Sequence, residues 1–364
     1  MLARHRRMFA IVAFLVLAAP LVVGLVAPDS PSTVLKEGRF LAPAPRLPVT
    51  EAGWLALPKQ VDAYLRDHFG LRQALITAHR ELTKPMLGFG NYNVLVGRNG
   101  RLFYLGEDTV RQSAGLVLRD ERVSQASALL ARMNAALAAR GIKFLVAIPP
   151  NASTIYQDDL PLWAQRRGRR TEYDLLLEQL RAKGVRAIDL RPVEMEARAK
   201  GPAYYMHDTH WTAWGALAGF NAIVEADGRP DWRLDPKSAL AKPTPHEDGD
   251  LARMLGVEGL TETAQDLALP YPRTELLSAN PFSDYVATSG RPGPTIMVFG
   301  DSFTGGYVDR MLLPHAGRVV WLEHRKCAFD WRMIDRFHPD EVWWMPNERF
   351  LICDPGAKPA GFAG

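Results

Sequence analysis

Cysteine is scarce in this chain of 364 residues, which contains only Cys327 and Cys353. Two thiols cannot build the disulfide framework of a small secreted domain, and their spacing does not match a zinc site. A strong excess of either charge is also missing, since 44 Lys and Arg stand against 40 Asp and Glu. Nucleic-acid binding is therefore not expected. What remains is a composition of 47% hydrophobic residues, typical of a globular protein with a sizeable core.

An uncharged apolar run occupies residues 8–27 near the N-terminus. A helix rises about 1.5 Å per residue, so roughly 20 apolar residues span the hydrocarbon core of a bilayer. Arg4, Arg6 and Arg7 precede the run and favour a cytoplasmic N-terminus. We therefore predict an N-terminal transmembrane helix in the inner membrane, with the catalytic domain in the periplasm. A cleaved signal peptide is the alternative, although Pro28 makes a poor processing site.

Prolines are frequent between residues 28 and 50, which indicates an extended linker. In the periplasm, an oxidising space, the two cysteines could pair, although the sequence does not give their distance. The predicted domain order is a cytoplasmic stub and anchor at 1–27, a linker at 28–53, a catalytic domain at 54–352 with an irregular insertion at about 229–293, and a tail at 353–364.

Helical and strand-like segments alternate from residue 120 onward. The pattern predicts helices over 120–140, over 171–183 and after Trp211, and apolar strands at 143–150, 185–190, 295–300, 318–324 and 341–346. Continuous apolar strands separated by helices are typical of a parallel sheet that is covered on both faces. We therefore predict an α/β fold with a parallel sheet flanked by helices.

The motif Gly-Asp-Ser at 300–302 ends the predicted strand 295–300. Open α/β sheets bind ligands at the carboxyl ends of their strands, so Ser302 is the candidate nucleophile. A Ser hydroxyl needs a base to attack, commonly a His oriented by a carboxylate. Asp208 and His210, two positions apart ahead of an apolar helix, can supply both, and the three residues complete a candidate triad. Each residue alone is more often structural, as a cap, a turn or a buried ring, but all three at predicted carboxyl-edge loops of one sheet favour catalysis.

Two neighbouring tyrosines and a histidine stand close to this pair. Tyr204 and Tyr205 could stack on a sugar ring as substrate-binding residues, and packing in the core is the alternative. His207 together with Asp208 and His210 lacks a known metal-ligand spacing, so we predict a site without metal. The sequence also shows no nucleotide or acyl-CoA motif, and no cofactor is expected.

The Gly-Asp-Ser block and the Asp/His block resemble those of the SGNH (GDSL-like) hydrolase superfamily, in the reverse order along the chain. That order implies a circularly permuted sheet. Together with the segment 94–105, the apolar N-terminus and Gly249-Asp250-Leu251, the pattern is similar to the alginate O-acetyltransferase family of periplasmic polysaccharide acetylases. The resemblance implies triad roles for Asp208, His210 and Ser302. It also makes Asn347 a candidate oxyanion or substrate-binding residue, with a solvent-exposed loop residue as the alternative.

The resemblance implies an O-acetyltransferase that moves an acetyl group through an acyl-serine onto hydroxyls of an exported polysaccharide such as alginate. A membrane-embedded acyltransferase would supply the acetyl group, within an exopolysaccharide secretion complex. Two alternatives stay open at this point. A periplasmic carbohydrate acetyl esterase would use the same triad and end in water, whereas a polysaccharide-binding scaffold would need no triad.

Overall fold

The structure, a computed structural model, describes residues 47–67, 93–247, 249–277 and 284–362, together with scattered positions between 7 and 45. Two units separate by their contacts, and the larger one comprises residues 92–252 and 257–364. The other unit contains the helix α3 (Glu51–Asp67). No helix among the described residues is long and apolar enough to cross a bilayer. The predicted span 8–27 is described only at scattered positions.

A seven-stranded sheet forms the centre of the larger unit, with the strand order β4-β3-β11-β9-β10-β8-β7. The bounds are β3 (Lys143–Ala147), β4 (Ala187–Ile188), β7 (Arg273–Leu276), β8 (Tyr285–Thr288), β9 (Thr295–Gly300), β10 (Arg318–Glu323) and β11 (Glu341–Trp344). The strands from β4 to β10 in this order pair in parallel. Strand β8 runs antiparallel to both of its neighbours.

The sheet is therefore mixed, and the prediction of a parallel sheet is wrong at the β8 edge. Strands β7 and β8 come from the range 229–293, which was predicted to be irregular. They follow one another closely in the chain, and such consecutive strands can pair antiparallel without a crossover helix. The same range contains α11 (Pro236–Ala239), β5 (Thr244–Glu247), α12 (Asp250–Leu255) and β6 (Thr261–Ala264). Strands β5 and β6 form an antiparallel hairpin.

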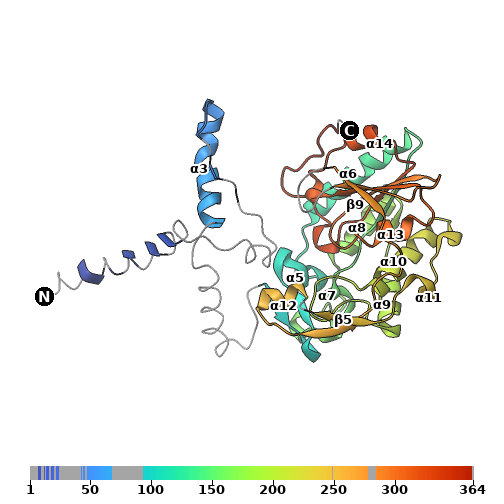
Figure 1. The fold of residues 1–364 in the computed structure, drawn as a ribbon, viewed down its shortest axis with the longest axis horizontal. Helices are drawn as coiled ribbons and strands as arrows, with labels where there is room; N and C mark the ends of the chain where they lie inside the picture. Colours follow the sequence, from blue (N-terminus) through green and yellow to red (C-terminus); the bar gives the residue numbers. More distant parts are fainter. Residues whose placement is uncertain are drawn as a thin grey trace. The chain divides into compact units, whose positions relative to one another are not determined.

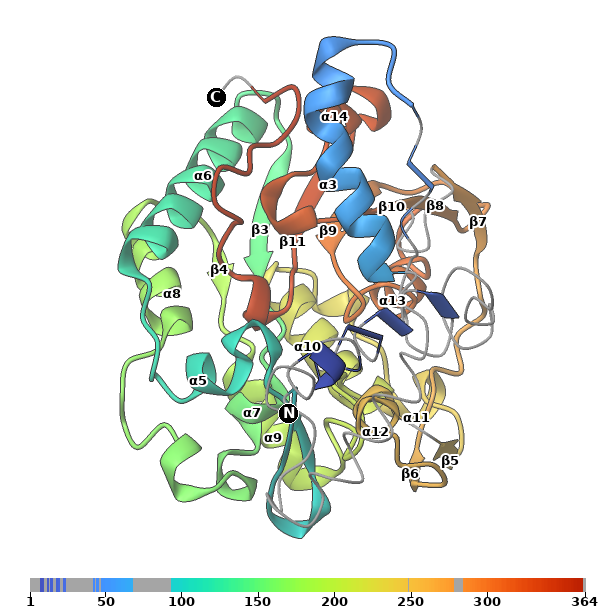
Figure 2. The same ribbon diagram turned by 90° about the vertical axis from the view of Figure 1, so that its left-hand side faces the viewer.

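Helices cover both faces of the sheet. One face packs on α6 (Asp120–Ala138), α8 (Glu172–Ala182) and α14 (Arg332–Phe337). The other packs on α7 (Ala152–Ile155), α9 (Arg191–Lys200), α10 (Ala213–Ala226) and α13 (Val308–Leu312). Figure 1 shows α6 and α10 on opposite sides of β9, and Figure 2 shows the strands from β3 to β7 side by side.

Strand β9 illustrates why the sequence folds this way. Successive side chains of a strand point to opposite faces of the sheet. Ile296 and Val298 accordingly belong to one hydrophobic core, and Met297 and Phe299 to the other. All residues of β9 are buried, which explains its uninterrupted apolar sequence.

Side-chain caps and turn residues set the ends of several elements. A capping box of Thr171 and Asp174 begins α8. The hairpin of β1 (Val94–Val96) and β2 (Leu102–Tyr104) turns at Asn99 and Gly100. Their φ angles are 59° and 79°, which Asn and Gly tolerate better than other residues. An Asn-Gly pair between two short apolar runs is the sequence pattern typical of such a hairpin. A short helix, α5 (Thr109–Ser113), follows it.

The C-terminal residues, predicted as a tail at 353–364, pack on the domain as far as they are described. Cys353 forms a disulfide with Cys327, so the two cysteines pair. Phe362 lies against Trp331, with ring centroids 4.4 Å apart. These contacts make the segment part of the domain, and the sequence could not indicate them because they join positions far apart in the chain.

Candidate active site

Ser302 lies directly after β9, between the carboxyl ends of β11 and β10. The turn is tight, because the Thr304 and Gly305 backbone N–H groups both donate to the Asp301 carbonyl oxygen, at 3.0 and 3.1 Å. The buried Asp301 side chain accepts from the Phe303 N–H at 2.9 Å. Ser302 itself is exposed. The turn therefore presents the hydroxyl to solvent on a fixed backbone.

The Asp/His segment precedes α10. Thr212 caps that helix, since its hydroxyl accepts from the Gly215 N–H at 3.2 Å. Asp208 is therefore not the cap that the structural alternative required. The Trp211 indole N–H donates to the Phe303 carbonyl oxygen at 2.7 Å, which ties this segment to the turn that carries the serine.

Asp208, His210 and Ser302 form a continuous hydrogen-bonded chain. His210 Nδ1 lies 2.6 Å from Asp208 Oδ1, and His210 Nε2 lies 2.8 Å from Ser302 Oγ. Because an ionised carboxylate only accepts, the proton on the neutral ring belongs on Nδ1, and Nε2 can then accept from the serine hydroxyl. The three candidate residues thus meet in the arrangement of a nucleophile, a base and an orienting acid.

Charges around the imidazole favour its protonated form. Burial alone would lower the pKa of His210, but the hydrogen bond and charge of Asp208 and the charge of Asp250 raise it above its usual value, while Arg349 opposes the rise. Burial would raise the pKa of Asp208, yet the bond and charge of His210 keep that pKa well below the usual range. Asp208 therefore stays ionised and can stabilise an imidazolium.

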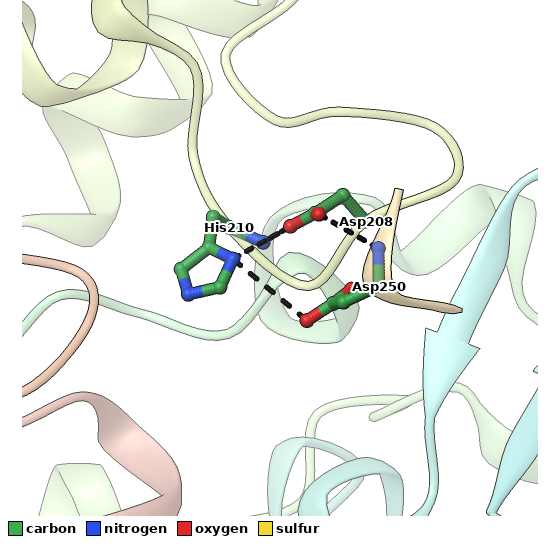
Figure 3. A group of neighbouring side chains, drawn as sticks. All are labelled: Asp208, His210 and Asp250. Atoms are coloured by element: carbon green, nitrogen blue, oxygen red, sulfur yellow. Dashed lines mark hydrogen bonds and ion pairs between the residues drawn. The ribbon is translucent and has the colours of Figure 1, made fainter. Parts of the chain in front are cut away.

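A second carboxylate, Asp250, joins the site without having been assigned a role from the sequence. Figure 3 shows it beside the imidazole, on the same nitrogen as Asp208. Its Oδ2 lies 3.8 Å from His210 Nδ1, and its backbone N–H donates to Asp208 Oδ2 at 2.8 Å. The triplet Gly249-Asp250-Leu251 contributed to the family resemblance, but only the folding of the 229–293 range brings Asp250 to the triad.

Arg349 is a second residue without a role assigned from the sequence. Its guanidinium carbon lies 5.3 Å from the centroid of the Phe303 ring, next to the nucleophile turn. It also lines a small pocket of about 10 Å³ together with Thr209. The one signal in the sequence is its position shortly after a strand end.

The tyrosines predicted to bind substrate lie in different surroundings. Tyr204 is fully buried, and its hydroxyl donates to the Pro150 carbonyl oxygen at 2.7 Å. It is a core residue, as the alternative held, because its polar atom is used inside the fold. The ring of Tyr205 stacks on that of His246 from β5, with centroids 4.2 Å apart.

Asn347 is also buried, with 0% of its surface exposed. Its backbone N–H donates to Asp301 Oδ2 at 2.7 Å, and its Nδ2 donates to the Pro149 carbonyl oxygen at 3.0 Å. Its Oδ1 accepts from Arg349 Nε at 3.0 Å. The predicted oxyanion or substrate-binding role does not match this placement, because every polar group of the side chain is used within the fold. The exposed loop position that was the alternative is not found either.

The comparison with known families rests on residues 94–337. They match the family described as "SGNH hydrolase-like domain, acetyltransferase AlgX". The chain belongs to this family. The matched range includes the three candidate triad residues, and the match confirms the family resemblance inferred from the motifs. Acetyl transfer is thus supported at the level of the family.

Proteins similar to the chain include one curated relative and two solved structures. The relative, from Pseudomonas putida, is named "Probable alginate O-acetylase AlgJ" and is 24% identical over 207 residues, 56% of this chain and 52% of the relative. The chain therefore spans about half the length of the curated relative that it matches. The structure of Bacillus cereus PatB1 covers 72% of this chain and 97% of its own, with a TM-score of 0.52 and 14% identity. The O-acetyltransferase domain of Pseudomonas putida AlgJ covers 71% and 92%, with a TM-score of 0.49 and 19% identity.

The similarity to PatB1 shows a shared fold and nothing finer at this identity. With the family match, it supports an SGNH hydrolase-like α/β fold built on a mixed sheet.

Proposed function

We propose that this chain is an O-acetyltransferase that moves an acetyl group through an acyl-Ser302 intermediate onto hydroxyls of an exported polysaccharide. The observation that carries the proposal is the hydrogen bond of 2.8 Å between Ser302 Oγ and His210 Nε2, with Asp208 on the opposite ring nitrogen. Alginate is the first acceptor to test, because the curated relative is named as an alginate O-acetylase.

In the first half-reaction, Ser302 Oγ attacks the carbonyl carbon of an acetyl ester while its proton passes to His210 Nε2. The negative charge that develops on the carbonyl oxygen can be held by the backbone N–H of the nucleophile turn. The bond to the donor oxygen then breaks, and His210 returns the proton to that oxygen. Ser302 is left as an acetyl ester.

In the second half-reaction, a sugar hydroxyl gives its proton to His210 Nε2 and attacks the acetyl carbon. The ester bond to Ser302 Oγ breaks, and the proton on His210 returns to that oxygen. The side chain of His210 is 25% exposed, so a polymer hydroxyl can approach it.

The same proposal places the chain in the inner membrane through residues 8–27, with residues 28–53 as a linker and the catalytic domain in the periplasm. A disulfide between Cys327 and Cys353 supports an oxidising compartment. Because acyl-CoA is a cytoplasmic donor, a membrane-embedded acyltransferase within the secretion complex would deliver the acetyl group. Cleavage of the N-terminal segment is the alternative for the anchor.

An acetyl esterase is the second candidate function, and the exposure of Ser302 favours it, because water can reach an acyl-enzyme there. Both functions share the triad and the first half-reaction. They differ only in the group that accepts the acetyl.

The test uses the purified full-length chain, a chromogenic acetyl ester as the donor and alginate oligosaccharides as acceptors. A transferase is expected to acetylate the oligosaccharide. It should also carry a transient acetyl group on Ser302, which mass spectrometry of the peptide containing Ser302 detects. Ser302→Ala is expected to lose both signals while keeping its thermal unfolding temperature. Release of acetate alone would favour the esterase. Acetylation of the oligosaccharide by Ser302→Ala would overturn the assigned nucleophile.

A further inference from the structure

Asp250 and the segment that carries Asp208 and His210 are joined by reciprocal hydrogen bonds. The Asp250 backbone N–H donates to Asp208 Oδ2 at 2.8 Å. In return, Asp250 Oδ1 accepts from the Thr209 N–H at 2.7 Å, and Oδ2 accepts from the Thr209 hydroxyl at 2.6 Å. Asp250 is thus bonded to two successive residues of the segment that carries the base.

We propose that Asp250 is a positioning residue that fixes the orientation of Asp208 and His210 and stabilises the protonated imidazole during acetyl transfer. The inference rests on the proposed function where it concerns the rate of acetyl transfer. Its structural part, a second carboxylate that acts on His210, does not depend on the reaction.

Backbone contacts hold Asp250 in this place. A Cβ on Gly249 would lie 2.3 Å from the His207 carbonyl oxygen and 2.8 Å from Asp208 Cβ, so only glycine allows this close approach. The Ala252 N–H donates to the same His207 oxygen at 3.1 Å. Residues 249–252 therefore lie directly against the base segment.

The geometry explains how Asp250 acts on the ring without a hydrogen bond to it. Asp208 Oδ1 accepts the hydrogen bond from the Nδ1–H group of His210, with 2.6 Å between oxygen and nitrogen. Asp250 Oδ2 lies 3.8 Å from the same nitrogen. At 3.8 Å the carboxylate contributes mainly its negative charge. That charge stabilises the imidazolium that forms when His210 takes the proton of Ser302.

Charged and titratable groups approach His210 from each element around it. Asp208 lies on its own segment, Asp250 on α12, and Arg349 after β11, and Ser302 follows β9. The two carboxylates raise the pKa of His210 and Arg349 lowers it. Asp250 has a raised pKa of its own, owing to burial and to the charge of Asp208, while His210 and Thr209 counteract the rise.

The experiment compares Asp250→Asn with the full-length wild-type chain. Neutral His210 is the active base, so kcat/KM for acetyl-enzyme formation rises with pH as the ring loses its proton. Removal of the Asp250 charge is expected to move this rise about one pH unit lower, because one negative charge close to the ring is lost. The asparagine can still accept from the Thr209 N–H, so the segment should keep its fold.

Glu262→Gln is the matched control, because Glu262 in β6 holds the preceding residues of the same segment and its carboxylate lies 3.6 Å from the ring of His207. Its carboxylate oxygens accept from the Met206 and His207 N–H groups at 2.7 and 3.0 Å. This variant is expected to change the maximal rate but not the pH at which kcat/KM rises. An unchanged pH profile in Asp250→Asn, or equal shifts in both variants, would overturn the positioning role.

A second readout separates this inference from the proposed function. The titration of His210 is followed by NMR on histidine-labelled protein, with His210→Gln to assign its signal. In Asp250→Asn the midpoint is expected to fall by about one pH unit whether or not the wild type transfers acetyl groups. A shifted midpoint without any acetyl transfer would end the proposed function alone, and an unshifted midpoint would end the inference. If Asp250→Asn does not fold, Asp250→Ser, whose hydroxyl can still accept from Thr209, serves for both measurements.

Discussion

His210 Nε2 lies 2.8 Å from Ser302 Oγ, although 92 positions separate the two residues in the chain. The sheet explains this meeting, because β9 carries Ser302 to its carboxyl edge and α10 packs on one face of the same sheet. The bond from the Trp211 indole to the Phe303 carbonyl fixes the two segments to each other. The catalytic proposal depends on the contact between Ser302 Oγ and His210 Nε2.

Asp208→Asn should leave the fold intact and remove most of the activity. An amide cannot hold the Nδ1 proton as a carboxylate does, so the ring is free to turn or to adopt the other tautomer. The expected loss in the rate of acetyl-enzyme formation is roughly 10³–10⁴-fold. Stopped-flow measurement with a chromogenic acetyl ester checks the rate, and circular dichroism checks the fold. A loss of less than about tenfold would show that Asp208 does not orient the base.

Gly249→Ala should impair activity through the position of Asp250. Its Cβ would lie within 2.6 Å of the His207 carbonyl group, so the segment must move away from the base. Gly201→Ala is the control, because the new Cβ would lie 3.5 Å from the Trp214 ring, an ordinary van der Waals contact, and the φ angle of 179° suits alanine. We expect a reduced kcat in Gly249→Ala and a near wild-type kcat in Gly201→Ala. Equal rates would show that the close approach at Gly249 is not required.

Glu348→Gln should reduce the dependence of stability on pH. Burial raises the pKa of Glu348 to about 7, even though the Asn151 N–H and the Thr154 hydroxyl donate to it. The folded state therefore binds a proton that the unfolded state has released, and stability falls as pH rises from about 4.5 to 7. The contribution is roughly 3 kcal/mol at most.

Chemical denaturation at pH 5 and pH 8 measures this contribution. The wild type should lose more free energy of unfolding between the two pH values than Glu348→Gln does. Burial also raises the pKa of Glu194, so Glu194 makes the stability of both proteins fall with rising pH. The difference in pH dependence between the wild type and Glu348→Gln therefore reports Glu348. Identical losses would contradict a protonated Glu348 in the folded state.

Removal of the disulfide should lower stability. Cys327 and Cys353 are 26 positions apart. Removing a disulfide that closes a loop of this length is expected to lower the free energy of unfolding by roughly 3 kcal/mol. Thermal unfolding of the wild type with and without dithiothreitol, beside the Cys327→Ser/Cys353→Ser variant, checks the effect. Dithiothreitol should lower the unfolding temperature of the wild type only. An unchanged wild type would mean that the bond adds no stability.

Local sequence patterns predicted most of the framework. The apolar runs at 143–150, 295–300 and 341–346 contain β3, β9 and β11, because strands buried on both faces have no polar side. The hairpin turn also follows a local pattern, because Asn99 and Gly100 tolerate the positive φ angles that it requires. Strands β7 and β8 escaped prediction, because the range 229–293 that contains them has no continuous apolar run of the kind that marks β9.

The amino-acid sequence identifies the groups that are available for chemistry: a serine at a strand end, and a carboxylate and an imidazole two positions apart. Tertiary structure alone decided which groups meet. It brought Asp250 to His210 from the 229–293 range, and it buried Asn347, whose backbone N–H donates to Asp301 Oδ2. The physical reason is that periodicity, caps and turns depend on neighbours in the chain, whereas a hydrogen bond across the sheet edge depends on how whole elements pack.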